Sequence, residues 1–96
     1  MKKFIFLYYG YKEPTADIHE AWSQWFASIG DKLIDGGNPF GVGRDVNHAG
    51  TTDLPHDENA ITGYSIINAD SLDEAEKIAS TCPFMSGIYV YEAMPM

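Results

Sequence analysis

The sequence predicts a single α+β domain of the ferredoxin-like type, with the element order βαββαβ. Apolar runs of strand length alternate with two segments of helical period, and the chain has 96 residues, the size of one core. A capping motif at Ser71 marks the start of the second helix. We therefore expect one domain over residues 1–96, in which a four-stranded antiparallel sheet carries both helices on one face.

The first strand is predicted at residues 4–9, where every side chain is apolar or aromatic. A run that is apolar on both alternating faces is typical of a strand inside a sheet. The run is too short for the core of a signal peptide or for a membrane span. We therefore expect a central strand. We also expect a cytoplasmic protein.

A helix is predicted at about residues 15–35, where the apolar period becomes helical. At 100° per residue the apolar side chains fall within about a third of a turn. They are Ile18, Trp22, Trp25, Phe26, Ile29 and Leu33. Gly36, Gly37 and Pro39 follow as stop signals, so this helix is expected to pack its stripe on the sheet and to end there.

The next two strands are predicted at residues 38–46 and at about residues 60–69. The first of these is rich in glycine, which weakens a strand pattern. Between them, residues 47–59 are polar and include Gly50 and Pro55. We expect this segment to be a loop.

The second helix is predicted to begin at Ser71, in the sequence Ser-Leu-Asp-Glu. In a capping box, the Ser71 hydroxyl accepts from the Glu74 backbone N–H, and the Glu74 carboxylate reaches back to the Ser71 N–H. Pro83 ends the helix, and a last strand is expected at Gly87–Ala93.

The predicted strands have two apolar faces, although the helices cover only one. In the last strand Tyr89 and Tyr91 alternate with Ile88 and Val90. A monomer would expose a larger aromatic patch than soluble monomers usually carry. We predict a homodimer that packs sheet against sheet.

The charge of the chain disfavours two classes of partner. Six Lys and Arg residues against fourteen Asp and Glu residues give a net charge of −8. Such a surface repels phosphate backbones and anionic lipids, so we expect neither nucleic-acid binding nor membrane binding. The single cysteine, Cys82, excludes an internal disulfide, and its place on a buried stripe in the last helical turn disfavours a thiolate nucleophile.

The chain resembles the YCII-related family, including its DGPF-motif branch. The resemblance lies in GYSIINADSLDEAEKIASTCP at residues 63–83, and in His19 followed by Gly30 and then LIDGG. It implies a dimeric ferredoxin-like α/β barrel with a His/Asp pocket, in a family where one related member carries out dehydrohalogenation. The Asp-Gly-Pro-Phe motif is absent here, and the nearest match, starting at Asp53, retains only the Asp and the Pro.

Topology selects the candidate site residues around His19. The first helix starts where the first strand ends, so His19 lies near the Tyr9 end of the sheet, and the loop at residues 47–59 returns to the same edge. His48, Asp53, His56 and Asp57 are therefore expected near His19. On a continuous helix, Asp35 would be about 24 Å away.

A histidine beside a carboxylate is the minimum for general acid/base catalysis, because the carboxylate orients the imidazole. We predict His19 as the catalytic base, with Asp53 as the candidate acid and Asp57 still open. A pocket would add Tyr9, Trp22, His48 and His56, with Tyr9 or Tyr11 supplying a hydrogen bond. The histidine spacing fits no compact metal motif, so neither a metal nor a cofactor is expected.

Two functions from different classes follow. In the first, the protein is a small lyase-like or proton-abstracting enzyme that acts on a small organic molecule. In the second, it is a non-catalytic dimeric module that binds a small molecule or supports a partner, and His19 is incidental. The two differ in whether His19 opens onto a concave pocket that contains a carboxylate.

Overall fold

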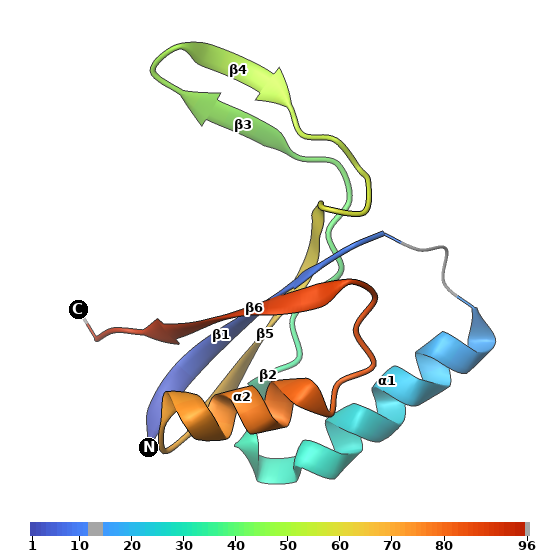
Figure 1. Ribbon diagram of the computed structural model, residues 1–96, viewed down its shortest axis with the longest axis vertical. Helices are drawn as coiled ribbons and strands as arrows, with labels where there is room; N and C mark the ends of the chain where they lie inside the picture. The colour runs from blue at the N-terminus through green and yellow to red at the C-terminus, as the bar shows by residue number, and fades with distance from the viewer. Residues whose placement is uncertain (12–14, 96) are drawn as a thin grey trace.

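The computed structural model describes residues 1–11 and 15–95 as an α+β fold. One antiparallel sheet has the strand order β2-β5-β1-β6 and is accompanied by two helices, an arrangement compatible with the predicted ferredoxin-like fold (Figure 1). A separate hairpin is made by β3 and β4. The bounds in chain order are β1 Lys2–Tyr9, α1 Ala16–Ile29, β2 Leu33–Asp35, β3 Arg44–Asn47, β4 Gly50–Asp53, β5 Ile61–Ala69, α2 Leu72–Ser80 and β6 Gly87–Ala93.

Strand β1 lies in the middle of the sheet, as predicted. It pairs with β5 on one side and with β6 on the other, so that Phe6 lies opposite both Ser65 and Val90. Phe4 and Phe6 are fully buried, whereas the alternating Ile5 is only half-buried. One face of the sheet therefore supplies the core.

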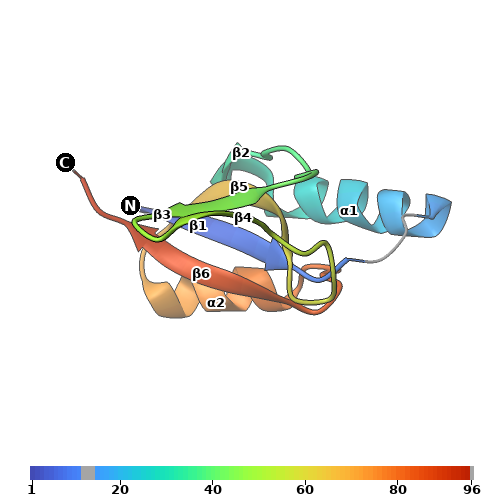
Figure 2. The same cartoon turned by 90° about the horizontal axis from the view of Figure 1, so that it is seen from above.

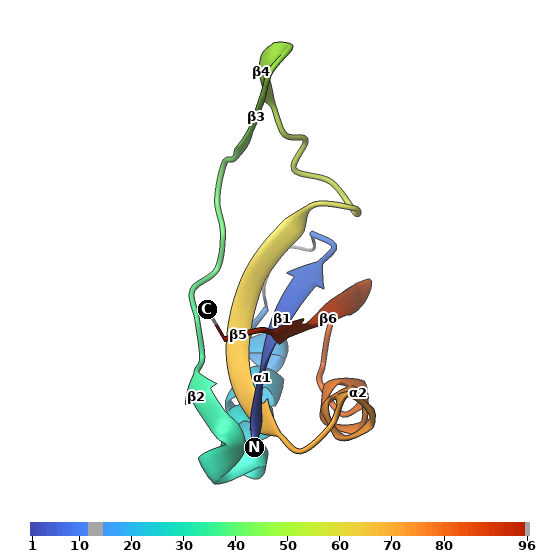
Figure 3. The same ribbon diagram turned by 90° about the vertical axis from the view of Figure 1, so that its left-hand side faces the viewer.

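Both helices pack on that buried face (Figure 1). The ring of Trp25 in α1 lies 6.4 Å from that of Phe6, and α2 contributes the buried Ala75 and Ala79 to the same cluster. In Figure 3, β5 and β1 lie in front of α1, and no helix of the described residues covers the face toward the viewer. The prediction of two helices on one face is confirmed.

The first helix ends six residues earlier than predicted. It stops at Ile29 because Gly30 adopts φ +55°, and a short 3-10 turn then leads into β2. Leu33 fits the helical stripe by its spacing from Ile29, but it pairs with Ile67 as part of the sheet. The helical spacing alone could not show whether Leu33 is buried by a longer helix or by a strand of the sheet.

The second strand is likewise displaced from the predicted residues 38–46. The strand of the main sheet is β2, Leu33–Asp35, and it is followed by an isolated bridge between Pro39 and Gly63. Arg44 and Val46 belong to the hairpin instead. The predicted loop at residues 47–59 was wrong over its first part, because β4 occupies Gly50–Asp53.

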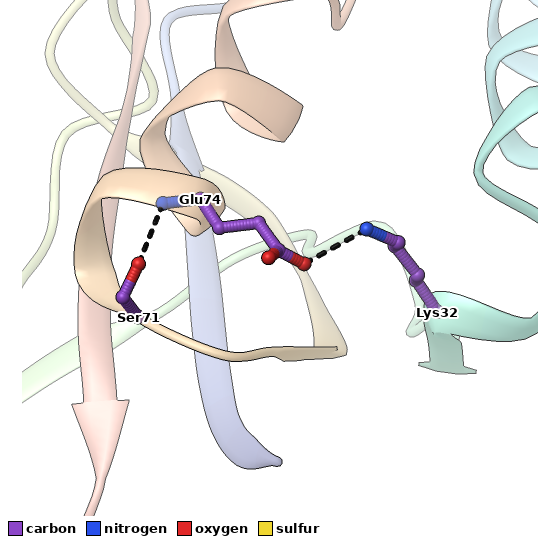
Figure 4. Close-up of polar contacts among 3 residues, drawn as sticks. All are labelled: Lys32, Ser71 and Glu74. Carbon is purple, nitrogen blue, oxygen red and sulfur yellow. Dashed lines mark hydrogen bonds and ion pairs between the residues drawn. The ribbon is translucent and has the colours of Figure 1, made fainter.

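The start of α2 confirms half of the predicted capping box (Figure 4). The Glu74 backbone N–H donates to Ser71 Oγ at 3.1 Å. Instead of reaching back to Ser71, the Glu74 carboxylate accepts from Lys32 Nζ at 2.8 Å. Within residues 1–11 and 15–95, no helix has the length and apolar character needed to cross a membrane.

Candidate functional site

A cavity of about 390 Å³ lies between α1 and the edge of the sheet where β1 ends and β5 begins. This volume falls within the range of small-molecule sites, roughly 300–1,000 Å³. The cavity is bounded by α1, by residues 36–40, by the strand ends, and by His56 and Met85.

The helical wall of the cavity is apolar and aromatic. Ile18, Trp22 and Phe26 line it at four-residue intervals, which place them on one face of α1. The Trp22 ring meets Tyr8 edge-on at 4.8 Å and lies 5.7 Å from Phe26. These contacts fix the Trp22 indole between the sheet and the cavity.

The opposite wall is the extended segment at residues 36–40, which runs beside β5. The Phe40 backbone N–H donates to the Thr62 carbonyl at 2.8 Å. Gly37 adopts φ +75°, and a Cβ there would lie 1.7 Å from the Tyr64 carbonyl oxygen. Only glycine permits this approach, so the wall depends on Gly37.

A buried hydrogen-bond relay joins the core to this wall. The Tyr8 hydroxyl donates to Ser65 Oγ at 2.8 Å, and Ser65 Oγ donates to the Gly36 carbonyl at 2.9 Å. Ser65 is fully buried. Burial raises the pKa of the Tyr8 phenol well above its usual range, so the hydroxyl stays protonated and can donate to Ser65.

Two histidines line the cavity at its exposed side. His19 comes from α1, and His56 comes from the connection between β4 and β5. The His56 ring lies 4.2 Å from the Tyr11 ring in an edge-on contact, and Tyr11 also lines the cavity. All three residues are exposed to solvent.

Three of the six predicted site residues therefore meet at one cavity: His19, Trp22 and His56. The other three, Tyr9, His48 and Asp53, do not line it. Tyr9 stacks on Tyr89, at 4.5 Å between ring centroids, and His48 lies in the exposed hairpin turn. The Asp53 carboxylate forms an ion pair with Arg44, with 3.2 Å between Oδ1 and Nε, and the Asp53 side chain is 86% exposed.

Asp35, which the continuous-helix assumption placed far from His19, contacts two residues of the cavity. Its Oδ1 accepts from the Gly37 backbone N–H at 2.8 Å, and its Oδ2 accepts from the Tyr64 hydroxyl at 3.3 Å. Asp35 adjoins the cavity because α1 ends early and β2 pairs with β5 in the sheet. The sequence Asp-Gly-Gly at residues 35–37 favours an Asx turn, and it was the sequence signal that could have predicted the Asp35–Gly37 contact.

Comparison with known proteins assigns no family to the chain. No protein-family model, curated protein or solved structure matches it. In the part of the chain that the structure describes, no group of three His, Cys, Asp or Glu side chains is placed to hold a metal ion. None of the described residues that line the cavity carries a carboxylate.

Proposed function

We propose that this protein binds a small organic molecule in the cavity between α1 and the sheet edge. The observation that carries the proposal is the division of its lining: Ile18, Trp22 and Phe26 form an apolar wall, and His19 and His56 lie at the exposed side. Ligand sites combine apolar walls with a few polar groups that set orientation. The expected ligand has a planar apolar body and one polar end.

The histidines suit recognition of that polar end. A neutral imidazole donates from one ring nitrogen and accepts at the other. The Tyr11 hydroxyl adds a third group that both donates and accepts. This set favours a hydroxyl, carbonyl or carboxylate on the ligand.

A cavity-filling variant tests the proposal. Ile18→Trp places an indole in the cavity, and Ala27→Trp adds the same group at an exposed position of α1. In a ligand-observed NMR screen of aromatic fragments, we expect hits for the wild type and for Ala27→Trp that disappear with Ile18→Trp. Hits that persist equally in all three proteins contradict the proposal.

Proton abstraction from a small molecule is the second and weaker candidate: two imidazoles line one cavity, but none of the described lining residues supplies the carboxylate that distinguishes the catalytic alternative. His19 would act as the base, without Asp53, whose carboxylate pairs with Arg44. The test is deuterium incorporation from D₂O into fragments that carry an acidic C–H bond. Catalysis predicts exchange that His19→Ala abolishes, whereas equal exchange in both proteins removes this candidate.

We also propose that the protein is a homodimer packed through its uncovered sheet face, as in a dimeric α/β barrel. The support is aromatic: Tyr89 and Tyr91 are 47% and 59% exposed on that face. Their burial against a second copy would remove apolar surface from water.

We propose in addition that the chain belongs to the YCII-related family, on the strength of residues 63–83. We also propose a cytoplasmic location, which the single Cys82 supports.

A further inference from the structure

The hairpin of β3 and β4 has no core of its own. Every residue of both strands is exposed. Val46 in β3 is 75% exposed, and Val42, two residues before β3, is 100% exposed. Its pairing is nevertheless regular, and an Arg44–Asp53 ion pair joins its two strands. An isolated two-stranded hairpin is at best marginally stable in water, so a surface that covers these valines would stabilise it.

The hairpin also lies on a particular side of the molecule. Figure 1 shows it projecting beyond the ends of β1 and β5 and leaning away from α1. Figure 2, seen from above, likewise places its strands on the side away from α1. Because α1 packs on the buried face, the hairpin overhangs the side of the uncovered face, which looks toward the viewer in Figure 3.

We propose that the β3–β4 hairpin is an arm that clasps a second copy of this chain seated on the uncovered sheet face. This inference rests on the dimer proposed above and adds a second contact to it. The exposed apolar side chains of Val42 and Val46 match an apolar partner surface. The Asp53 carboxylate is paired with Arg44 inside the hairpin, so its charge is offset there. In a two-fold dimer each arm would contact the other subunit, so the contact is made twice.

The arm is joined to the ligand cavity at both of its ends. The entering chain, residues 36–40, forms one wall, and the returning chain carries His56. At the base, the Leu54 backbone N–H donates to the Gly43 carbonyl at 3.0 Å, and Phe40 stacks on Tyr64 at 5.8 Å. An arm held by a partner thus fixes the wall at residues 36–40 and the segment that carries His56, so ligand binding and dimerisation strengthen one another.

Sedimentation equilibrium tests the arm. Val42→Asp/Val46→Asp places two negative charges on the proposed contact. Thr52→Asp places one on the opposite hairpin face, because Thr52 pairs with Asp45 rather than with Val46. We expect the double variant to weaken dimerisation at least tenfold and Thr52→Asp to change it less than twofold. Circular dichroism should show the same fold in all three proteins, and equal dimerisation constants overturn the clasp.

Tyr91→Asp separates failure of the arm from failure of the dimer. If Tyr91→Asp gives monomers while the valine variant remains a wild-type-like dimer, the sheet interface stands and the arm proposal falls. A wild type that stays monomeric at every concentration overturns both.

The coupling between ligand binding and dimerisation is measured with 2-naphthol as the ligand. Its affinity for the wild type should fall at least threefold when the protein is diluted until it is monomeric. An unchanged affinity overturns the coupling.

Discussion

Removal of the Ser65 hydroxyl tests how the core holds the cavity wall. Ser65→Ala leaves two buried groups without their partner: the Tyr8 hydroxyl, which donates at 2.8 Å, and the Gly36 carbonyl, which accepts at 2.9 Å. A buried polar group that loses its partner costs about 1–3 kcal/mol. We therefore expect a loss of about 3 kcal/mol, or roughly 12–24 °C in Tm for a domain of this size.

A double-mutant cycle with Tyr8→Phe isolates the first bond. Tyr8→Phe alone leaves the Ser65–Gly36 bond in place, so we expect a smaller loss of about 1 kcal/mol. Because the two side chains are in contact, the double variant should be more stable than the sum of the single losses predicts, by roughly 1 kcal/mol.

The assay is urea denaturation followed by circular dichroism at one fixed protein concentration, since dimerisation would make the midpoint depend on concentration. Ser80→Ala is the matched control: its exposed hydroxyl donates to the Lys77 carbonyl, and its removal should change stability by less than about 0.5 kcal/mol. The reasoning is refuted if Ser65→Ala is as mild as Ser80→Ala and the cycle is additive.

Three further predictions concern other parts of the chain. Gly37→Ala should destabilise the fold by about 2 kcal/mol or more, because its Cβ would lie 1.7 Å from the carbonyl oxygen of Tyr64 in β5. Gly41→Ala is the control: its Cβ would meet nothing within 4 Å, so it should be nearly neutral in the same urea denaturation. A hydrogen bond from Lys32 lowers the pKa of Glu74 in the folded protein. The stabilisation that the ionised Glu74 carboxylate provides is therefore present above its unfolded pKa and is lost as pH falls through its folded pKa. Glu74→Gln should flatten the acid side of a curve of Tm against pH, and an unchanged slope would contradict this. Burial raises the pKa of the Cys82 thiol to about 12, so Ellman's reagent at about pH 8 should react only after unfolding, and rapid reaction with the folded protein would disprove burial.

The sequence was sufficient for the elements whose signals are local. The apolar run of β1, the Ser71 cap and the order of the four main-sheet strands and two helices follow from residue pattern, whereas the β3–β4 hairpin does not. The end of α1 was not predictable in this way, because Ile29 and Leu33 satisfy a helical stripe equally well whether the chain continues or turns at Gly30. Backbone φ at one glycine decided the outcome.

The same distinction applies to the site. His19 and Trp22 could be predicted because both sit on one helix beside a known sheet edge, and His56 because its segment returns there. Asp53 and His48 were placed with His56 as parts of one loop, yet four-residue strands carry them into the hairpin. Ser65 was missed because a serine in an apolar strand gives no signal of its two partners.

The indole signals of the two tryptophans test the central claim most directly. Trp22 lines the cavity, whereas Trp25 is buried and its Nε1–H donates to Thr81 Oγ1 at 2.9 Å, so the second signal is an internal reference. In ¹H–¹⁵N spectra of the labelled protein, binding of fragment hits should shift the Trp22 Nε1–H signal several-fold more than that of Trp25, whose ring meets Trp22 edge-on at 5.8 Å. Hits that bind without moving Trp22, or that move both signals equally, would contradict a ligand site in this cavity.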